Sequence, residues 1–220
     1  MKKIYLLLLL LGIANVSVSQ TIKEVDSMSN IFCNYLKKLD IKNDTLKLNT
    51  LYEQKFYPYL RNVESSKIDQ IGNQLYYRLQ RNCLGFRELL DRLDPPKDGV
   101  DRNSGKPPSQ LTKKQIKELK KRTEFYYYEV SGEKTKVVMK DGFWTDYFSD
   151  NTTSKLTYTW ISDTEFELVF IESDNESRSN FSIKGDRFIY QILSKEDNFY
   201  WMTLNIPGQV TYEKSKIYFK

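Results

Sequence analysis

The sequence predicts an α+β protein in which an N-terminal helical subdomain of about three helices precedes an antiparallel β-meander. Between residues 21 and 93, apolar side chains recur every three or four positions, as along one face of a helix. After residue 123 they recur every second position, as in half-buried strands. A stretch rich in proline and glycine separates the two patterns. The chain therefore divides into a leader (1–19), a helical subdomain (20–93), a linker (94–112) and a β-domain (113–220).

The leader has the pattern of an export signal. Two lysines precede an apolar run from Ile4 to Ile13, and Ser17 and Ser19 stand where a signal peptidase reads small residues. The run is too short for a bilayer, which needs roughly 20 helical residues, and no later segment is apolar enough to span one. We therefore expect a signal peptide over 1–19, cleavage before Gln20, and a mature protein that is periplasmic or secreted.

The composition excludes several classes of function. The chain has 34 Lys plus Arg and 29 Asp plus Glu, so without the two leader lysines its net charge is +3, too mild to indicate a nucleic-acid partner. The absence of histidine excludes every Ser-His, Cys-His and histidine-base mechanism. No phosphate-binding loop and no GxGxxG occurs, so we expect no cofactor.

Cys33 and Cys83 are the only cysteines. An even count in an exported chain favours a disulfide between them, because disulfides persist in oxidising compartments. The alternative is two separate buried thiols. A metal site is disfavoured, because the chain has neither histidine nor a CxxC pair.

The first two helices of the helical subdomain follow from the apolar spacing. One stripe indicates a helix from Ile22 to near Asp40. A second helix is expected from Thr45 to about Val63, and Pro58 should kink it or end it early.

The third helix has the clearest pattern. Its apolar stripe continues from Ile68 to Leu93, roughly seven turns, and Ser66 with Asp69 resembles a capping box at its start. The two cysteines fall on the flanks of the first and third stripes. A disulfide would therefore cross-link a small helical bundle at one point.

The linker contains four prolines and two glycines, and we expect a solvated connection that does not pack. Thr112 and Gln115 have the spacing of a capping box for a short helix. Basic residues crowd this helix from Lys113 to Arg122. They indicate either peripheral contact with an anionic lipid or polyanion, at about 1 kcal/mol per basic residue, or a solvated helix face.

The β-domain contains nine short segments with the pattern of strands, separated by turn signals. They are EFYYYEV, KTKVVMK, FWTDYF, KLTYTWIS, EFELVFIE, SNFSIK, RFIYQILS, FYWMTL and VTYEKSKIYF. Short connections indicate a meander. About a hundred residues of meander close into a barrel or fold as two packed layers, because an open sheet would leave long edges exposed.

The stretch KLTYTWISDTEFELVF predicts a hairpin with one face of large apolar side chains, most of them rings. Across the β-domain we expect nine such side chains inside the barrel: Trp144, Tyr158, Trp160, Phe166, Leu168, Phe170, Phe188, Tyr190 and Trp201. They either fill the interior or line a cavity for one apolar ligand. In the second case the ligand-binding residues are Trp144, Tyr158, Trp160, Phe166, Phe170, Tyr190 and Trp201.

The same stretch, with SGEKTKVVMKDGFWTDYF before it and GDRFIYQIL and FYWMTL after it, resembles a β-domain of small exported proteins from Gram-negative bacteria. In that family a strand ending in Trp leads through an acidic turn into Glu and an aromatic residue, matched here by Trp160, Asp163, Glu165 and Phe166. Thr164 and Phe166 stand where the family more often has Cys and Tyr. The resemblance covers roughly residues 125–220 and implies a lipocalin-like outline, with no assigned activity and no catalytic residue.

We therefore expect a non-enzymatic envelope protein that acts as a binding module for a small apolar ligand. One alternative is a protein–protein interaction or inhibitor/immunity-type protein, which would use the helical subdomain and exposed tyrosines. Another is a hydrolase that uses two carboxylates. Its candidate acids are Asp141, Asp146, Asp163, Glu165 and Glu167, but a chain with 29 acidic residues offers such pairs by chance.

Overall fold

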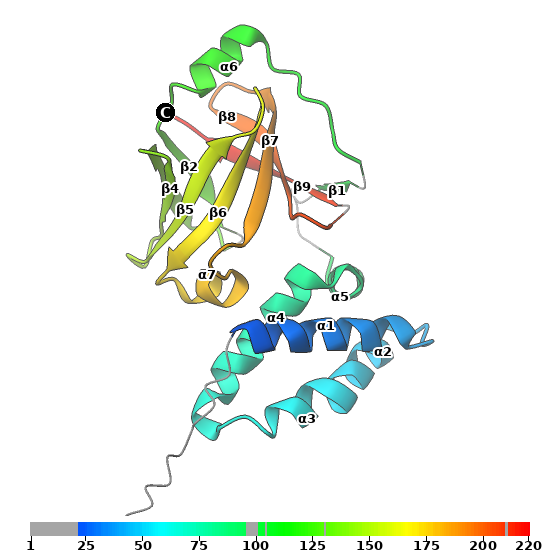
Figure 1. The fold of residues 1–220 in the computed structure, drawn as a ribbon. Helices are drawn as coiled ribbons and strands as arrows, with labels where there is room; N and C mark the ends of the chain where they lie inside the picture. The colour runs from blue at the N-terminus through cyan, green and yellow to red at the C-terminus, as the bar shows by residue number, and fades with distance from the viewer. Residues whose placement is uncertain (1–21, 96–100, 104, 130, 210) are drawn as a thin grey trace, which may run out of the picture.

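The computed structural model describes residues 22–95, 101–103, 105–129, 131–209 and 211–220. The predicted signal peptide over 1–19 lies outside the described residues. The described chain is an α+β protein with a helical subdomain beneath a closed antiparallel barrel (Figure 1).

The helical subdomain begins with one long helix and continues through several shorter ones. Its elements are α1 (Ile22–Lys38), α2 (Asp44–Leu51), a π-helical turn (Tyr52–Phe56), α3 (Tyr57–Leu60), a 3₁₀ turn (Ser65–Lys67), α4 (Ile68–Asn82) and α5 (Leu84–Leu93). Their apolar faces form one core, which includes Val25, Phe32, Leu36, Leu51, Leu75, Leu79 and Phe86.

The second helix continues through Pro58 and ends at Leu60, short of the predicted end near Val63. Helical backbone continues from Asp44 to Leu60, with the π-helical turn immediately before Pro58. Proline fits the first turn of α3, where a missing N–H is tolerated, and the extra residue of the π turn accommodates its ring. The helix then ends shortly after the proline.

The prediction of one long third helix is wrong. The helix breaks at Cys83, whose φ of −126° and ψ of 95° are extended, and α5 begins at Leu84. The predicted capping box is also wrong, because the Ser66 hydroxyl donates to the Glu64 carboxylate at 2.6 Å within the 3₁₀ turn. The residue before α4, Lys67, makes no side-chain cap.

The predicted disulfide is confirmed. Cys33 and Cys83 are bonded, with their Cα atoms 5.5 Å apart, a separation typical of disulfides. The bridge joins the C-terminal half of α1 to the break between α4 and α5. It therefore fixes the point at which the chain changes direction.

The barrel contains eight antiparallel strands in sequence order and a ninth short strand on its seam. The strands are β1 (Asp101–Asn103), β2 (Glu124–Tyr128), β3 (Lys134–Lys140), β4 (Phe143–Tyr147), β5 (Thr153–Trp160), β6 (Glu165–Ser173), β7 (Arg187–Lys195), β8 (Phe199–Asn205) and β9 (Tyr212–Tyr218). The barrel closes where β9 pairs with β8 along its length and meets β2 at Tyr126 and Tyr218. β1 pairs with the start of β9, beside this seam.

Two predicted segments of the β-domain differ in the structure. The segment SNFSIK is not a strand, because residues 176–181 form α7 (Glu176–Phe181). The Asn175 side chain accepts from the backbone N–H of Arg178 at 3.2 Å and starts this helix. The linker packs, contrary to prediction: it supplies β1, and the Gln110 N–H donates to the Leu193 carbonyl at 2.7 Å.

Short helices lie at both ends of the barrel (Figure 1). At one end is α6 (Lys113–Leu119), which begins with the predicted capping box of Thr112 and Gln115 and buries Leu119 in the barrel core. At the other end α7 lies between the barrel and α4. The ring of Phe181 stacks there on Phe188 with centroids 6.4 Å apart.

The helical subdomain and the barrel have separate apolar cores joined by arginine–carboxylate contacts. Arg78 of α4 binds Asp26 of α1 at 2.5 Å and Asp186 of the β-domain at 2.5 Å. Arg87 of α5 binds Glu213 of β9 at 2.8 Å. We call this set of contacts the arginine junction.

Candidate functional site

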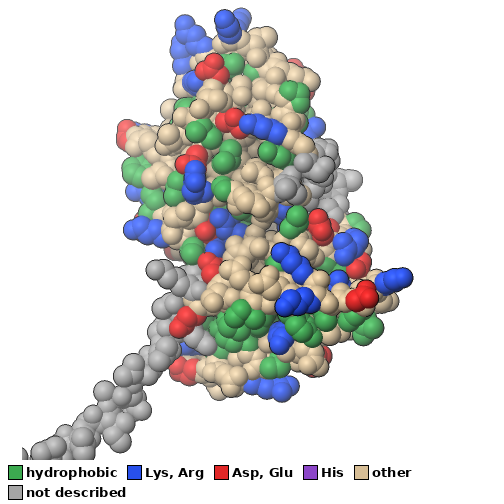
Figure 2. All heavy atoms as spheres, turned by 45° about the vertical axis from the view of Figure 1, so that its right-hand side comes forward, with side chains coloured by type: hydrophobic (Ala, Val, Ile, Leu, Met, Phe, Trp, Pro, Cys, Tyr) green, Lys and Arg blue, Asp and Glu red, His purple; other side chains and the backbone are tan. Residues whose placement is uncertain are grey.

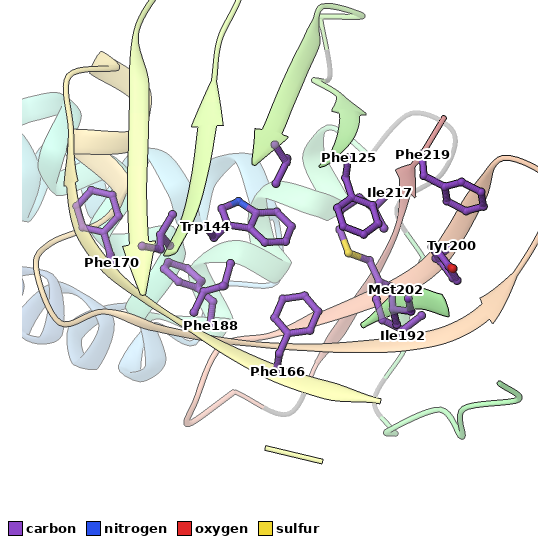
Figure 3. Packing of buried hydrophobic residues seen from close by; sticks show 14 of the residues in the cluster. Phe125, Trp144, Phe166, Phe170, Phe188, Ile192, Tyr200, Met202, Ile217 and Phe219 are labelled. Atoms are coloured by element: carbon purple, nitrogen blue, oxygen red, sulfur yellow. The ribbon is translucent and has the colours of Figure 1, made fainter. Parts of the chain in front are cut away.

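The barrel interior is largely filled by its own side chains. Figure 3 shows rings and aliphatic side chains from opposite strands pointing toward one another. Of the seven predicted ligand-binding residues, Trp144, Phe166 and Phe170 are buried in this core. The interior positions predicted for Leu168 and Phe188 are also confirmed.

Three more predicted residues face inward but are only half-buried. Tyr158, Trp160 and Tyr190 pack against the core from β5 and β7. Each has its ring centroid 5.4 Å from that of Phe166, which lies at the centre of the group. These rings form a cluster in the α6 half of the barrel.

The prediction for Trp201 is wrong, because its side chain lies on the barrel exterior. Its neighbours on β8, Tyr200 and Met202, are buried in the core. Side chains on a strand alternate between its two faces, so Trp201 points outward. There its ring contacts Phe199, with centroids 5.5 Å apart.

Trp160 connects the ring cluster to the basic helix α6. The Lys120 ammonium lies 4.9 Å from the Trp160 ring centroid and 3.0 Å from the Asp163 carboxylate. An ammonium over an indole face is attracted by the negative face of the ring. Lys120 thus stands between the half-buried indole and solvent.

Beside Lys120, a shallow groove of about 370 Å³ opens between α6 and the turn that joins β5 to β6. It is lined by Lys113, Ile116, Lys117, Lys120, Lys121 and Asp163. We call it the α6 groove. Figure 2 shows Lys and Arg side chains projecting from the end of the molecule where α6 lies.

The α6 groove combines positive charge with apolar surface. Its four lysines face a single carboxylate, and the stems of the lysines and Ile116 supply apolar walls. Ile161, in the adjacent turn, is 56% exposed. The groove therefore suits a molecule that carries an acidic group and an apolar part.

A polar cluster occupies the opposite end of the barrel interior, near α7. The Trp144 indole N–H donates to the Asp146 carboxylate at 2.8 Å, and Asp146 is 6% exposed. Burial raises the pKa of Asp146 to about 6, while the Trp144 hydrogen bond and Arg178 oppose the shift. Burial, followed by the charge of Asp146, raises the pKa of Tyr127 as well.

Arg178 of α7 closes this polar end. Its guanidinium donates to both carboxylate oxygens of Glu129, at 2.8 and 2.9 Å, and to the Tyr127 hydroxyl at 3.3 Å. The Thr135 hydroxyl donates to the same carboxylate at 2.9 Å. The sequence gives no signal for this cluster, because Arg178 lies in a segment with the composition of a turn.

The candidate acids of a two-carboxylate hydrolase do not meet at one site. Asp146 lies inside the barrel, whereas Glu165 and Glu167 lie outside it and bind Lys106 at 2.6 Å and Arg187 at 2.5 Å. Asp141 and Asp163 lie in turns. The sheet therefore separates the buried acid from the others.

Among the residues that the structure describes, no group of three or more Cys, Asp and Glu side chains is placed to hold a metal ion. No helix within the described ranges is both long and apolar enough to cross a bilayer.

Comparisons with known proteins do not assign the chain to a family. No protein-family model matches the sequence, and no curated protein or solved structure shows significant similarity to it. Function is therefore inferred from the α6 groove and the ring cluster.

Proposed function

We propose that the protein is an exported, non-enzymatic binding protein that holds a small amphipathic anion at the α6 end of its barrel. The observation that carries the proposal is the contact between the lysine-lined groove and the half-buried ring of Trp160, through Lys120. The apolar part of the ligand would lie against Ile116 and the stem of Lys120, which covers the ring of Trp160. Its acidic group would be bound by the lysines.

The filled interior limits how deeply a ligand can enter. Phe166, at the centre of the ring cluster, is 3% exposed, and Leu119 of α6 is buried beside the same core. A ligand at this end would therefore rest at the rim rather than at the centre of the barrel. Its charged group would stay in solvent, where binding weakens with added salt.

The same lysines would bring the protein to an anionic surface. Peripheral contact of Lys113 to Arg122 with anionic lipid is part of this proposal, at about 1 kcal/mol per basic residue near the surface. Delivery from such a surface would place an amphipathic ligand beside the groove.

Native mass spectrometry of the mature protein exported from a bacterial host tests whether it carries a ligand. We expect extra mass that disappears on denaturation and is extractable into organic solvent. Oleate and oleyl alcohol then form a matched pair of probes, equal in chain and different in charge. We expect oleate to bind more tightly, because only its carboxylate can use the lysines.

A double variant locates the binding to the α6 groove. Lys117→Gln with Lys121→Gln should weaken oleate binding about 25-fold, at about fivefold per lysine, and leave oleyl alcohol unaffected. The matched control, Lys37→Gln with Lys38→Gln on α1, should bind like the wild type. Equal loss in both variants, or no saturable binding by the wild type, rejects the proposal.

A protein partner is the second candidate, favoured by exposed apolar side chains on the helical subdomain. Ile31, Leu46 and Tyr57 are 50%, 55% and 45% exposed. We would expect one stoichiometric partner in a pull-down from envelope extract, lost in an Ile31→Ser, Tyr57→Ser variant. An inhibitor or immunity-type role would require that partner to be an enzyme or a toxin.

A further inference from the structure

Five outward-facing rings form a continuous row across β2, β9 and β8. The row consists of Tyr126, Tyr128, Tyr218, Phe199 and Trp201, and we call it the aromatic row. Tyr218 is central, with its ring centroid 5.2 Å from Tyr126, 5.4 Å from Tyr128 and 5.4 Å from Phe199. The row crosses the seam at which the barrel closes.

Three lysines lie over the aromatic row. The ammonium of Lys134 is 3.7 Å from the Tyr126 ring centroid, and that of Lys214 is 4.3 Å from the Trp201 centroid. Lys216 is 4.9 Å from the centroids of both Trp201 and Phe199. The rings hold the ammonium groups above the sheet.

The positive charge of the row is not neutralised locally. In the described part of the chain, none of the three lysines forms an ion pair. Glu124 of β2 is 3.5 Å from Lys136, and Glu213 of β9 binds Arg87 at the arginine junction. The exterior of these strands therefore presents unpaired cations between rings.

We propose that the aromatic row docks this flank of the barrel on the surface of an anionic lipid bilayer. Tyr and Trp have an apolar body and a polar tip, which suits the level of the lipid headgroups. Lys extends an apolar stem with a charge at its end, which reaches anionic headgroups. The proposal is independent of the ligand proposed for the α6 groove.

The shape and composition of the row favour a bilayer over a linear polyanion. The exterior of a closed barrel is convex, and a convex face can meet a broad surface without a groove to follow. The cations of the row are all lysines, whereas phosphate recognition in nucleic acids favours the planar fork of arginine. Tyr128, 52% exposed, is the ring most open to headgroups.

The basic segment ends beside the last residues of the chain. Arg122, at the end of the basic segment, stacks on Phe219 at 4.0 Å and donates to the Lys220 carbonyl at 2.9 Å. Tyr218 of the row immediately precedes Phe219 in the chain. The aromatic row and the end of the basic segment therefore lie near the same end of β9, with Tyr218 on the outer face and Phe219 in the barrel core.

Vesicle sedimentation with the mature full chain tests the proposal. We expect binding to phosphatidylcholine vesicles that contain one third phosphatidylglycerol, and little binding to pure phosphatidylcholine. The triple variant Lys134→Gln, Lys214→Gln, Lys216→Gln should bind about 100-fold more weakly, at about fivefold per lysine. The charge-matched control Lys37→Gln, Lys38→Gln, Lys42→Gln, on exposed positions of the helical subdomain, should bind like the wild type.

Tryptophan fluorescence gives a second readout that does not depend on charge. The chain has three tryptophans, and of these Trp144 and Trp160 face the barrel interior. Brominated lipid should therefore quench wild-type fluorescence mainly through Trp201, and Trp201→Phe should abolish most of that quenching while retaining a ring in the row. Near-ultraviolet circular dichroism verifies that each variant is folded.

Three outcomes would overturn the proposal. The first is vesicle binding as tight as that of the wild type by the Lys134→Gln, Lys214→Gln, Lys216→Gln variant. This outcome includes the case in which vesicle binding is abolished only by a different variant, Lys113→Gln, Lys114→Gln, Lys117→Gln on α6. The second is quenching that persists in Trp201→Phe. The third is tight binding of soluble polyphosphate with no vesicle binding, which would assign the row to a polymer. Oleate binding by the α6 groove is measured separately. A negative result for bilayer docking therefore does not bear on the ligand proposed for the groove, and the reverse also holds.

Discussion

Asp146 illustrates how its position inside the barrel changes the chemistry of one carboxylate. In an unfolded chain the pKa of an aspartate is about 3.9, whereas burial raises that of Asp146 to about 6. Between these values the folded protein binds more protons than the unfolded chain. The free energy of unfolding therefore falls as the pH rises from about 4 to about 6, by on the order of 1 to 3 kcal/mol, and stays lower above this window.

Replacing Asp146 by asparagine should flatten this part of the pH dependence. Asp146→Asn retains an oxygen that can accept from the Trp144 N–H and carries no charge to desolvate. Urea unfolding from about pH 4 to about pH 8 would measure the change. Asp163→Asn is the control, because the side chain of Asp163 is 81% exposed and its loss should leave the slope unchanged. An unaltered slope in Asp146→Asn would contradict the assignment.

Trp201 shows why the sequence predicted the interior only in part. At the start of β6, Glu165 and Glu167 alternate with Phe166 and Leu168, so the pattern alone places these two apolar residues inside, and Phe170 follows in the same register. On β8 the run FYWM is large and apolar at every position, so alternation cannot tell its two faces apart. Pairing with β7 and β9 decides the face, and that information is not local.

At the scale of elements, most of the architecture was predicted by the change in apolar spacing, from every three or four residues before the linker to every second residue after it. Eight of the nine strand segments form strands, and the basic helix begins at its predicted cap. The exceptions are short. β1 consists of three residues in a segment rich in proline and glycine, and α7 of six residues that start at an asparagine cap. Such elements owe their structure to tertiary packing, which overrides weak local preference.

The cap of α7 can be tested directly. Asn175→Ala removes the side-chain oxygen that accepts from the Arg178 N–H, and it should lower the free energy of unfolding by about 1 kcal/mol. Asn175→Ser retains an acceptor for the cap and, like alanine, lacks the amide that donates to Thr152 at 2.9 Å, so it should be the more stable of the two variants. Urea unfolding at constant pH would measure both variants, and equal losses would show that the cap contributes nothing.

The disulfide should make a large contribution to the stability of the helical subdomain. It closes a loop of about fifty residues, for which the chain-entropy model gives on the order of 3 to 4 kcal/mol. The double variant Cys33→Ala, Cys83→Ala should lose that amount in urea unfolding. The denatured, unreduced mass of the wild type should be lower than the full thiol mass by about two hydrogens, and a full thiol mass would refute the bridge.

At the scale of the whole molecule, the arginine junction couples two separate cores. Arg78 has 3% of its side chain exposed and binds carboxylates from both halves. Removing one partner of a buried ion pair leaves the other charge desolvated and unpaired. The helical subdomain and the barrel should therefore unfold together while Arg78 is present.

We expect Arg78→Ala to lower the free energy of unfolding by on the order of 3 kcal/mol and to separate the two transitions. All three tryptophans lie in the barrel region, so their fluorescence reports barrel unfolding, whereas far-ultraviolet circular dichroism is dominated by the helices. In the wild type the two signals should change at the same urea concentration, and in Arg78→Ala the helical signal should change first. Arg92→Ala is the control, because its pair with Asp44 lies within the helical subdomain and is largely exposed. Coincident transitions in Arg78→Ala would show that the remaining contacts between the halves, which include the Arg87–Glu213 and Arg81–Asp186 pairs, are sufficient to hold them together.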